Sequence, residues 1–528
     1  MTMSEDRRSQ ISSRTHGIPT NPSSLLDVLR FRARFDAHHT AIHESSGTSI
    51  TYEEWDTRSR LLRDGLCELG ARPGDHVGLV FDRRDWIGFA VTYLGVMRLG
   101  AVPVSIENHD ERIEARIQHA QVSICVVGNH VHREGKDWYL VDEVADRARQ
   151  PQDDADLGPG SVLDIVYTSG TVSGGYKAVR CRHSDWVSVA RLLPIRRQRV
   201  CVHSLYQPHS SAGVHSVLIN HLERGVLSVV ATPPTRYDDA ADAQYTADAV
   251  LVHRPHELML TPSLAGTLVG LNLIDPVTFA SVRYLKFGGS PLPLDIGDAV
   301  QKLLPKARIM SMYGTTEGGK AVLMSVWDRE NFDVLGPTSS ATSVRVIDAD
   351  GKEAEAGQTG EISIKAANSS GEIEYFGDIA ETKAVFDSGW VRTGDLGYID
   401  HQGMVHLVGR NKEMLILPSG LKVNSFRVER LLRESPLIKE ASVVGLEQKN
   451  QPYDVIAAAI VPADTSTPCE QLVGEYRRLT SELTPERTVV IQKLPRNAMG
   501  KVVRAEVKSL FSNHKASIID LRGASNPA

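Results

Sequence analysis

The chain has 528 residues, of which 41% are hydrophobic and 23% charged, and its formal net charge is −6. This composition is typical of a globular protein that is long enough for two or more domains. A weakly acidic chain without a basic cluster gives no reason to expect a nucleic-acid partner. No apolar run approaches the roughly 20 residues needed to cross a bilayer, so we expect no membrane span.

The first twenty residues are polar and contain three arginines but no apolar core, so they do not resemble a secretory signal. We expect residues 1–20 to form a disordered tail. Five cysteines are scattered along the chain without C-x-x-C or zinc spacing: Cys67, Cys125, Cys181, Cys201 and Cys469. Their spacing argues for reduced thiols and a cytoplasmic location.

Helical and strand patterns alternate through the first half of the chain. Residues 55–69 and 86–99 have helical patterns, whereas 76–81 and 122–127 are short apolar runs typical of strands. This alternation predicts a layered α/β architecture with largely parallel sheets.

Residues 150–160 are polar and rich in turn formers, which predicts a linker, and the apolar run 161–167 then reads as a buried strand. The strand leads into Tyr167-Thr-Ser-Gly-Thr-Val-Ser-Gly-Gly-Tyr-Lys177. Backbone N–H groups of such a loop can form an anion-binding nest, to which hydroxyls and an ammonium add phosphate contacts. We predict phosphate contacts from Thr168, Ser169, Gly170, Thr171, Ser173 and Lys177. An ordinary connecting loop has a similar composition, and Ala178 after the lysine excludes the G-x-x-x-x-G-K-[ST] loop.

Further along the chain, short alternating strands are predicted at residues 343–348 and 361–365, which indicates a smaller β-rich subdomain. After Arg410 the pattern restarts as a compact unit of about 100 residues.

Four more motifs follow the loop in a fixed order: Phe287-Gly-Gly-Ser-Pro-Leu-Pro293, Tyr313-Gly-Thr-Thr-Glu-Gly318, Gly389-Trp-Val-Arg-Thr-Gly-Asp-Leu396 with Gly409-Arg410, and Pro495-Arg-Asn-Ala-Met-Gly-Lys-Val-Val-Arg504. Together with the loop they resemble the core motifs of the adenylate-forming superfamily, which includes acyl-CoA synthetases, peptide-synthetase adenylation domains and beetle luciferase. The resemblance covers nearly the whole chain, because residues 50–55 and 70–79 are similar to the opening region of that family.

The resemblance implies an α/β fold with a large N-terminal domain of layered α/β subdomains plus a β-rich subdomain, and a small mobile α+β C-terminal domain. The predicted divisions are a disordered tail (1–20), the N-terminal adenylation domain (21–410), the mobile domain (411–512) and a flexible tail (513–528). Lys412 matches the hinge of the family, where aspartate is often found and lysine sometimes. A hinge needs only to absorb a change in φ and ψ.

The implied reaction is ATP-dependent activation of a small carboxylic acid as acyl-AMP, with release of pyrophosphate. Transfer to the pantetheine thiol of coenzyme A or of a stand-alone carrier protein acting in trans would follow. The catalyst must neutralise phosphate charge and align two anions that repel each other. By resemblance, Lys501 bridges the acyl carboxylate and the α-phosphate, Thr316 contacts the α-phosphate, and Glu317 is the Mg²⁺ ligand.

The resemblance implies further nucleotide contacts within the predicted N-terminal domain. Tyr313 would lie against adenine, and Asp395 would accept hydrogen bonds from both ribose hydroxyls with help from Arg410. The full set expected beyond the phosphate loop is Gly288, Gly289, Ser290, Tyr313, Gly314, Thr315, Thr316, Asp395 and Arg410.

The sequence says less about the identity of the carboxylic acid substrate. The expected substrate pocket includes His209, Gly213, Phe287, Gly318 and Lys320. The aspartate of amino-acid-activating relatives and the asparagine of many aryl-acid relatives are both missing from residues 206–213. His209 either closes the pocket as an aromatic gate or is a satisfied buried histidine. Lys320 either meets a second polar or anionic group of the acid, or points to solvent or pairs elsewhere.

Tyr176 and Ala178 stand where the family usually has proline and glycine. Because of this departure, a homologue that binds nucleotide without catalysis remains an alternative. A second alternative is transfer of the acyl group to an amine acceptor. The joint presence of Glu317, Asp395, Arg410 and Lys501 argues for catalysis.

Overall fold

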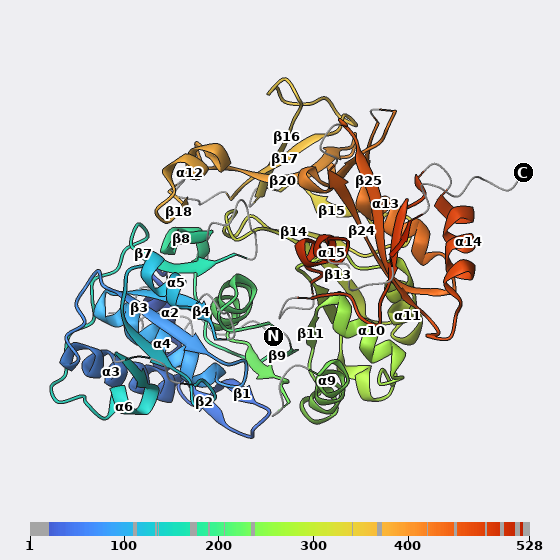
Figure 1. The fold of residues 1–528 in the computed structure, drawn as a ribbon. Coiled ribbons are helices and arrows are strands. Elements are labelled where there is room, and N and C mark those ends of the chain that lie inside the picture. The colour runs from blue at the N-terminus through green and yellow to red at the C-terminus, as the bar shows by residue number, and fades with distance from the viewer. Residues whose placement is uncertain are drawn as a thin grey trace, which may run out of the picture. The chain divides into compact units, whose positions relative to one another are not determined.

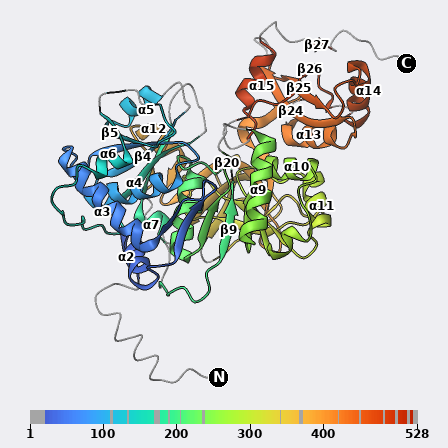
Figure 2. The same cartoon turned by 90° about the horizontal axis from the view of Figure 1, so that it is seen from below.

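The computed structural model, drawn in Figure 1 and from below in Figure 2, describes residues 21–108, 113–132, 135, 137–168, 177–187, 191–204, 206–233, 238–339, 342–366, 372–419, 421–447, 451–480, 483–496, 501–512 and 518–520. The chain falls into two compact units, the first comprising residues 1–344 and 364–391, the second 345–363 and 392–528. The predicted tail at 1–20 lies outside the described residues. Within the predicted tail at 513–528, residues 518–520 form strand β27, which pairs with the neighbouring strand β26.

The first unit contains a seven-stranded sheet of order β18-β8-β7-β4-β3-β5-β6. Its strands are β3 (His76–Phe81), β4 (Val102–Glu107), β5 (Val122–Val127), β6 (Trp138–Leu140), β7 (Val162–Tyr167), β8 (Ala178–Arg182) and β18 (Glu374–Tyr375). Strands β3 to β7 pair in parallel, and β8 and β18 extend the sheet with antiparallel pairs. The strands predicted at 76–81, 122–127 and 161–167 are confirmed as β3, β5 and β7.

Helices α3 (Tyr52–Glu68) and α4 (Trp86–Leu99) confirm the two predicted helices. Helix α3 begins three residues earlier than predicted, because Thr51 and Glu54 form a capping box at its start. Helix α4 is apolar on all sides, and every residue in it except Gly88 is buried. A helix of this kind is expected where protein surrounds it.

The predicted linker at residues 150–160 has neither helix nor strand, but it is anchored. The Asp154 carboxylate accepts hydrogen bonds from the guanidinium groups of Arg30, Arg63 and Arg98. Burial alone would raise the pKa of Asp154, but Arg98 and Arg30 bring it down to about 2. The linker is therefore held against helices α3 and α4 by paired buried charge.

The second sheet of the first unit has the order β14-β13-β12-β11-β9-β10-β1-β2. Its strands are β1 (Thr40–Glu44), β2 (Ser49–Thr51), β9 (Val200–His203), β10 (Leu227–Val230), β11 (Glu257–Leu260), β12 (Tyr284–Phe287), β13 (Arg308–Tyr313) and β14 (Leu323–Val326). Helices α9 (Asp239–His253), α10 (Pro262–Gly270) and α11 (Leu294–Leu303) share a core with it. Strands β9, β11, β12 and β13 run parallel, so their carboxyl ends lie at one edge of the sheet.

Shorter elements complete the first unit: α2 (Leu25–Phe35), α5 (Ile113–His119), α6 (Val141–Ala145), α7 (His183–Trp186), the π-helix η1 (Ala212–Ile219), α8 (Asn220–Arg224), the 3-10 helix η2 (Thr278–Ser281), β15 (Val334–Pro337), α12 (Ile379–Val385) and β19 (Phe386–Asp387). Within the described parts of the chain, no helix is both long and apolar enough to cross a membrane.

A β-rich part opens the second unit. Strands β16 (Thr342–Ile347), β17 (Gly360–Ala366), β20 (Trp390–Ile399) and β21 (Met404–Arg410) follow the order β21-β20-β17-β16, and the unit boundaries fall inside β16, β17 and β20. The strands predicted at 343–348 and 361–365 are confirmed as β16 and β17.

The rest of the second unit comprises the 3-10 helix η3 (Asn411–Glu413), β22 (Met414–Ile416), β23 (Lys422–Asn424), α13 (Ser425–Arg433), β24 (Ile438–Glu447), β25 (Asp454–Pro462), α14 (Cys469–Thr480), β26 (Arg487–Val490), α15 (Arg504–Leu510) and β27 (Ile518–Asp520). Alternate residues of the central strands enter different cores, since side chains alternate across a strand. Val443 and Ile456 pack with α13 and α14, whereas Val444 and Ala457 pack with α15. The sheet therefore has helices on both faces (Figure 2).

Candidate active site

Three of the predicted site segments leave the same edge of the eight-stranded sheet. Residues 206–213 follow β9, residues 288–290 follow β12, and residues 314–317 follow β13. Ligands of open α/β sheets bind outside the carboxyl ends of parallel strands, where these segments lie. Tyr206 Oη donates to Leu260 O at 3.1 Å, and a Cβ on Gly288 would lie 4.0 Å from Tyr206 Oη. The structure thus brings the first two segments together.

Residues 207–213 form a tight turn in which glycine is required. A Cβ on Gly213 would lie 1.8 Å from Gln207 O, a backbone atom that cannot move without the turn. The Gly213 N–H donates to Ser210 Oγ at 3.0 Å and closes the same turn. His209 is nearly buried, with Nε2 3.9 Å from Glu107 Oε1, and Phe287 is fully buried.

The Tyr313–Gly318 motif is fixed by hydrogen bonds within itself. The Gly318 N–H donates to Thr315 Oγ1 at 3.0 Å, and the Gly319 N–H donates to Thr316 O at 3.2 Å. A Cβ on Gly318 would lie 2.6 Å from Ile364 Cδ1, so the loop packs closely on β17. Glu317, in the same motif, is partly exposed.

Lys320 forms an ion pair with Glu223 of α8, and the Nζ to Oε2 distance is 2.5 Å. Burial lowers the pKa of Lys320, while the charge of Glu223 acts to raise it. The Glu223 carboxylate is almost completely buried, with 4% of its side chain exposed, and Lys320 is one partner of its charge. Lys320 therefore pairs within the protein, and its place in the substrate pocket stays a prediction.

The predicted phosphate loop is the connection of a β7–β8 hairpin. Tyr167 pairs with Ala178, and the Thr168 N–H donates to Lys177 O at 2.9 Å. Ser169, Gly170, Thr171 and Ser173 lie outside the described residues. At the end of the loop, Lys177 Nζ lies 2.5 Å from Glu381 Oε1.

The predicted metal ligand has a hydrogen-bond partner that the sequence did not suggest. Tyr375 Oη donates to Glu317 Oε1 at 2.8 Å. This bond uses one of about four lone-pair sites of the carboxylate. One carboxylate together with phosphate oxygens and water is a usual environment for Mg²⁺. The residues present therefore fit a Mg²⁺ ion that is held jointly by Glu317 and by the phosphates of a nucleoside triphosphate.

A buried polar chain connects the phosphate-loop strand to helix η1. His215 Nε2 lies 2.8 Å from Asp164 Oδ2, which also accepts from Tyr93 Oη at 2.7 Å. The Trp186 ring stacks on the His215 ring with 4.0 Å between centroids. Asp164, Cys181 and His215 each place a possible metal-ligand atom in one small region. Two ligands of one tetrahedral zinc ion would lie about 3.3 Å apart, so the 2.8 Å contact is a hydrogen bond.

In the second unit, Asp395 and Arg410 are partners. They face each other across the antiparallel β20–β21 pair, and Arg410 Nε lies 3.0 Å from Asp395 Oδ1. Asp395 is buried, whereas Arg410 is about half exposed at 47% of its side chain. A buried carboxylate beside an exposed guanidinium is suited to accepting hydrogen bonds from ribose hydroxyls.

Lys501 lies within reach of these charges. Burial and the positive charge of Arg410 lower its pKa, against the opposing effects of Glu413 and Asp395. The second unit therefore brings Asp395, Arg410 and Lys501 into one charged cluster. Lys412 is exposed in η3, and its role as a hinge stays a prediction.

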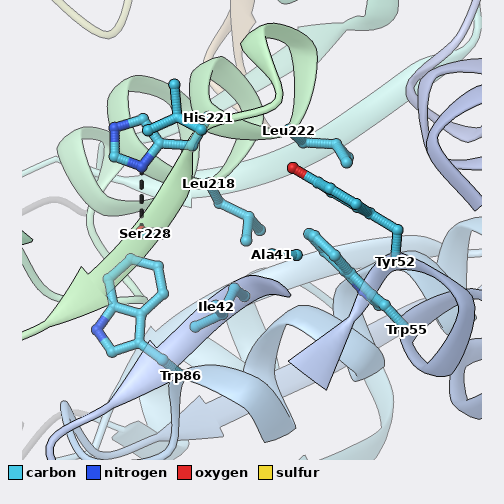
Figure 3. Close-up of a pocket in the computed structure, with 10 residues that line it drawn as sticks. Ala41, Ile42, Tyr52, Trp55, Trp86, Leu218, His221, Leu222 and Ser228 are labelled. Carbon is cyan, nitrogen blue, oxygen red and sulfur yellow. Dashed lines mark hydrogen bonds between the residues drawn. The ribbon is translucent and has the colours of Figure 1, made fainter. Parts of the chain in front are cut away.

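Figure 3 shows a small cavity elsewhere in the first unit, lined mostly by apolar side chains. Tyr52, Trp55 and Trp86 border it, and His221 Nδ1 lies 3.0 Å from Ser228 Oγ at its wall. None of its lining residues belongs to the predicted site.

Sequence reasoning missed Tyr375, Glu381, Glu223 and the Asp164–His215 pair. Asp164 gave one usable signal, because a carboxylate inside the apolar run 161–167 requires a buried partner. Tyr375 gave none, since it lies in a two-residue strand and meets Glu317 only through the tertiary fold.

Comparisons with known proteins bear on the family and the fold of the chain. The sequence model of the AMP-binding enzyme family matches residues 29–371. Long-chain-fatty-acid–CoA ligase FadD13 of Mycobacterium tuberculosis is 26% identical over 92% of this chain and 98% of its own. 4-Coumarate–CoA ligase 3 of Oryza sativa subsp. japonica is 27% identical over 90% of both chains. The crystal structure of ATP-bound MatB from Rhodopseudomonas palustris has a TM-score of 0.77 at 23% identity, over 92% of this chain and 99% of that one. The fold is therefore shared with that structure.

Proposed function

Because the chain belongs to the AMP-binding enzyme family, we propose that it is an ATP-dependent ligase that joins a carboxylic acid to the thiol of coenzyme A. In the first step a carboxylate oxygen attacks the α-phosphorus of ATP, and the bond to pyrophosphate breaks. In the second step the thiol sulfur attacks the acyl carbon, and AMP leaves while the thiol proton is lost to solvent or a base.

One observation supports this proposal most strongly. The carboxylate expected to hold Mg²⁺, Glu317, and the cation expected to bind phosphate, Lys177, both contact the side chain of Tyr375. A cation and a metal carboxylate in such proximity suit a polyphosphate, whose charge must be neutralised on several oxygens.

The second unit contributes the groups expected to act on the ribose and the acyl carboxylate. Asp395 with Arg410 would orient the ribose, and Lys501 would offset the charge that develops as the two anions meet. Its lowered pKa reflects burial first. Desolvation strengthens the electrostatic interaction of an ammonium with a phosphate.

The comparisons leave the acid open, since the curated relatives are named for fatty acids and for coumarate. Coenzyme A is the acceptor in both names, so we propose it ahead of a carrier protein or an amine. Small carboxylic acids of several classes are therefore the substrates to test.

The test is acid-dependent exchange of pyrophosphate into ATP, measured with Mg²⁺ and without a thiol, across fatty, aryl, dicarboxylic and amino acids. Lys501→Ala is expected to lower the exchange by at least about 100-fold. Lys508→Ala, which removes an exposed lysine from α15, is the matched control and should leave the rate unchanged.

Exchange with one acid class, followed by consumption of coenzyme A thiol, would support the proposal. Adenylation without thiol consumption would favour a carrier protein or an amine as acceptor. No exchange with any acid, despite ATP binding, would favour the non-catalytic homologue.

A further inference from the structure

Tyr375 is fixed beside the strand that leaves the phosphate loop. Its strand β18 pairs with β8 so that Tyr375 faces Val179, and the Phe376 N–H donates to Ala178 O at 2.8 Å. The Tyr375 N–H donates to Thr382 Oγ1 at 3.0 Å, and its ring meets the Phe386 ring edge-on at 5.4 Å. Only 5% of the residue is exposed. The ring is therefore immobilised by packing and by its own backbone.

The hydroxyl of this ring is aimed at Glu317. Tyr375 Oη lies 2.8 Å from Glu317 Oε1, and the phenol is the donor because its ordinary pKa is about 10. A hydrogen bond to a carboxylate is stronger than one between neutral groups, and it restricts the rotation of the carboxylate. One oxygen of Glu317 is thus held toward Tyr375.

The face of the same ring meets Lys177. The ammonium lies 4.6 Å from the ring centroid, within the range of a cation–π interaction. Glu381 holds the ammonium from another side. One aromatic side chain consequently touches both the expected phosphate cation and the expected metal ligand, which are 140 positions apart in the sequence.

We propose that Tyr375 is a positioning residue for the metal–triphosphate site. Its hydroxyl orients Glu317 and its ring locates the Lys177 ammonium, so that both are in place before the nucleotide binds. The inference rests on the proposed function, since it assigns to Tyr375 a part in binding Mg²⁺ and ATP. Pre-organised groups of this kind bind a charged ligand without paying for their own ordering.

The test compares Tyr375→Phe, which keeps the ring and loses the hydroxyl, with Tyr375→Leu, which loses both contacts. In acid-dependent pyrophosphate exchange, Tyr375→Phe is expected to raise the half-saturating Mg²⁺ concentration at least about 5-fold, consistent with loss of a charge-assisted hydrogen bond. KM for the acid should stay within about 2-fold of wild type. Tyr375→Leu should also raise KM for ATP.

Two controls separate positioning from general stability. Tyr476→Phe removes a buried hydroxyl that lies 2.9 Å from Thr488 Oγ1 in the second unit, and it should leave the Mg²⁺ dependence unchanged. In a Glu317→Gln background, Tyr375→Phe should cause no further rise in the Mg²⁺ requirement, because the group it acts through has changed. Binding of Mg²⁺–ATP by calorimetry repeats the comparison without catalysis.

Wild-type exchange with unaltered Mg²⁺ and ATP dependence in Tyr375→Phe would overturn the inference while leaving the proposed function intact. A lower melting temperature with no change in either dependence would overturn it too. Absence of exchange in the wild type, with no detectable binding of Mg²⁺–ATP, would overturn the proposed function and with it the inference.

Discussion

His215 Nε2 lies 2.8 Å from Asp164 Oδ2, and this contact joins helix η1 to the strand that enters the phosphate loop. On its other side, His215 Nδ1 lies 2.9 Å from Ser211 Oγ, which belongs to the segment predicted to form the substrate pocket. The chain of contacts thus runs from the expected acyl region to the expected phosphate region. Both Asp164 and His215 are fully buried, so water cannot replace either partner.

Asp164→Ala is expected to destabilise the protein by about 3 kcal/mol, because it leaves two buried donors, Tyr93 Oη and His215 Nε2, without their acceptor. Asp164→Asn keeps one acceptor oxygen and should cost about half as much. Urea unfolding with both variants measures the difference. Equal stability of Asp164→Ala and wild type would show that the contact does not hold β7 and η1 together.

Gly213→Ala should disturb the turn at residues 207–213, because its Cβ would lie 1.8 Å from Gln207 O. Overpacking of this kind costs about 1–3 kcal/mol, and we expect KM for the acid to rise about 10-fold as the turn moves. Gly474→Ala is the matched control, since a Cβ there meets nothing within 4 Å inside helix α14. That control should be neutral or slightly stabilising. Normal KM and stability in Gly213→Ala would contradict the requirement for glycine.

Lys320→Met should destabilise the protein by about 3 kcal/mol, because it removes the ammonium that pairs with the buried Glu223 carboxylate. The double variant Lys320→Met with Glu223→Met should recover most of that loss, as replacement of a buried ion pair by apolar groups is often neutral. A double-mutant cycle by chemical denaturation checks this expectation.

The same Lys320 variants test the contact with the acid. If the lysine serves only the ion pair, the ranking of acids in the exchange assay should stay unchanged in the double variant. A changed ranking would show instead that the ammonium meets a second polar group of the substrate.

Lowering the pH should destabilise the folded protein through its buried histidines. Burial lowers the pKa of His183 to about 4, well below its unfolded value of 6.5. The unfolded chain therefore binds a proton that the folded chain excludes between these values, and stability is lost as pH falls below 6.5. Between pH 7 and pH 5 the loss from His183 alone is about 2 kcal/mol.

His183→Asn tests this, because its side-chain oxygen can still accept the Leu25 N–H bond that His183 Nδ1 accepts at 3.1 Å. The pH dependence of the unfolding free energy should shrink in this variant. His38→Asn, at a side chain that is 92% exposed, should leave the dependence as in wild type. An unchanged slope in His183→Asn would assign the acid sensitivity to other groups.

Local patterns predicted much of the fold correctly. Helix α4 has the predicted bounds, because its apolar run is too long for a typical strand and ends at Gly100, which adopts φ +79°. The pairing of Asp395 with Arg410 was also expected, since both residues lie in motifs on strands that lead toward the predicted hinge. Strand β7 ends at Tyr167, directly before the predicted phosphate loop, whose residues 169–176 lie outside the described parts of the chain.

The sequence by itself determined the alternation of elements, the family and the order of the motifs, because these are recorded in neighbouring residues. Only the tertiary structure decided which side chains meet across long separations. Tyr375 reaches Glu317 over 58 positions, and Lys177 reaches Glu381 over 204. Such contacts follow from the pairing of β18 with β8 and the position of α12, and no local propensity specifies that arrangement. Lys320 shows the same limit. Its neighbours in the sequence do not distinguish a surface charge from a buried ion pair, and only the position of α8 brings Glu223 to it.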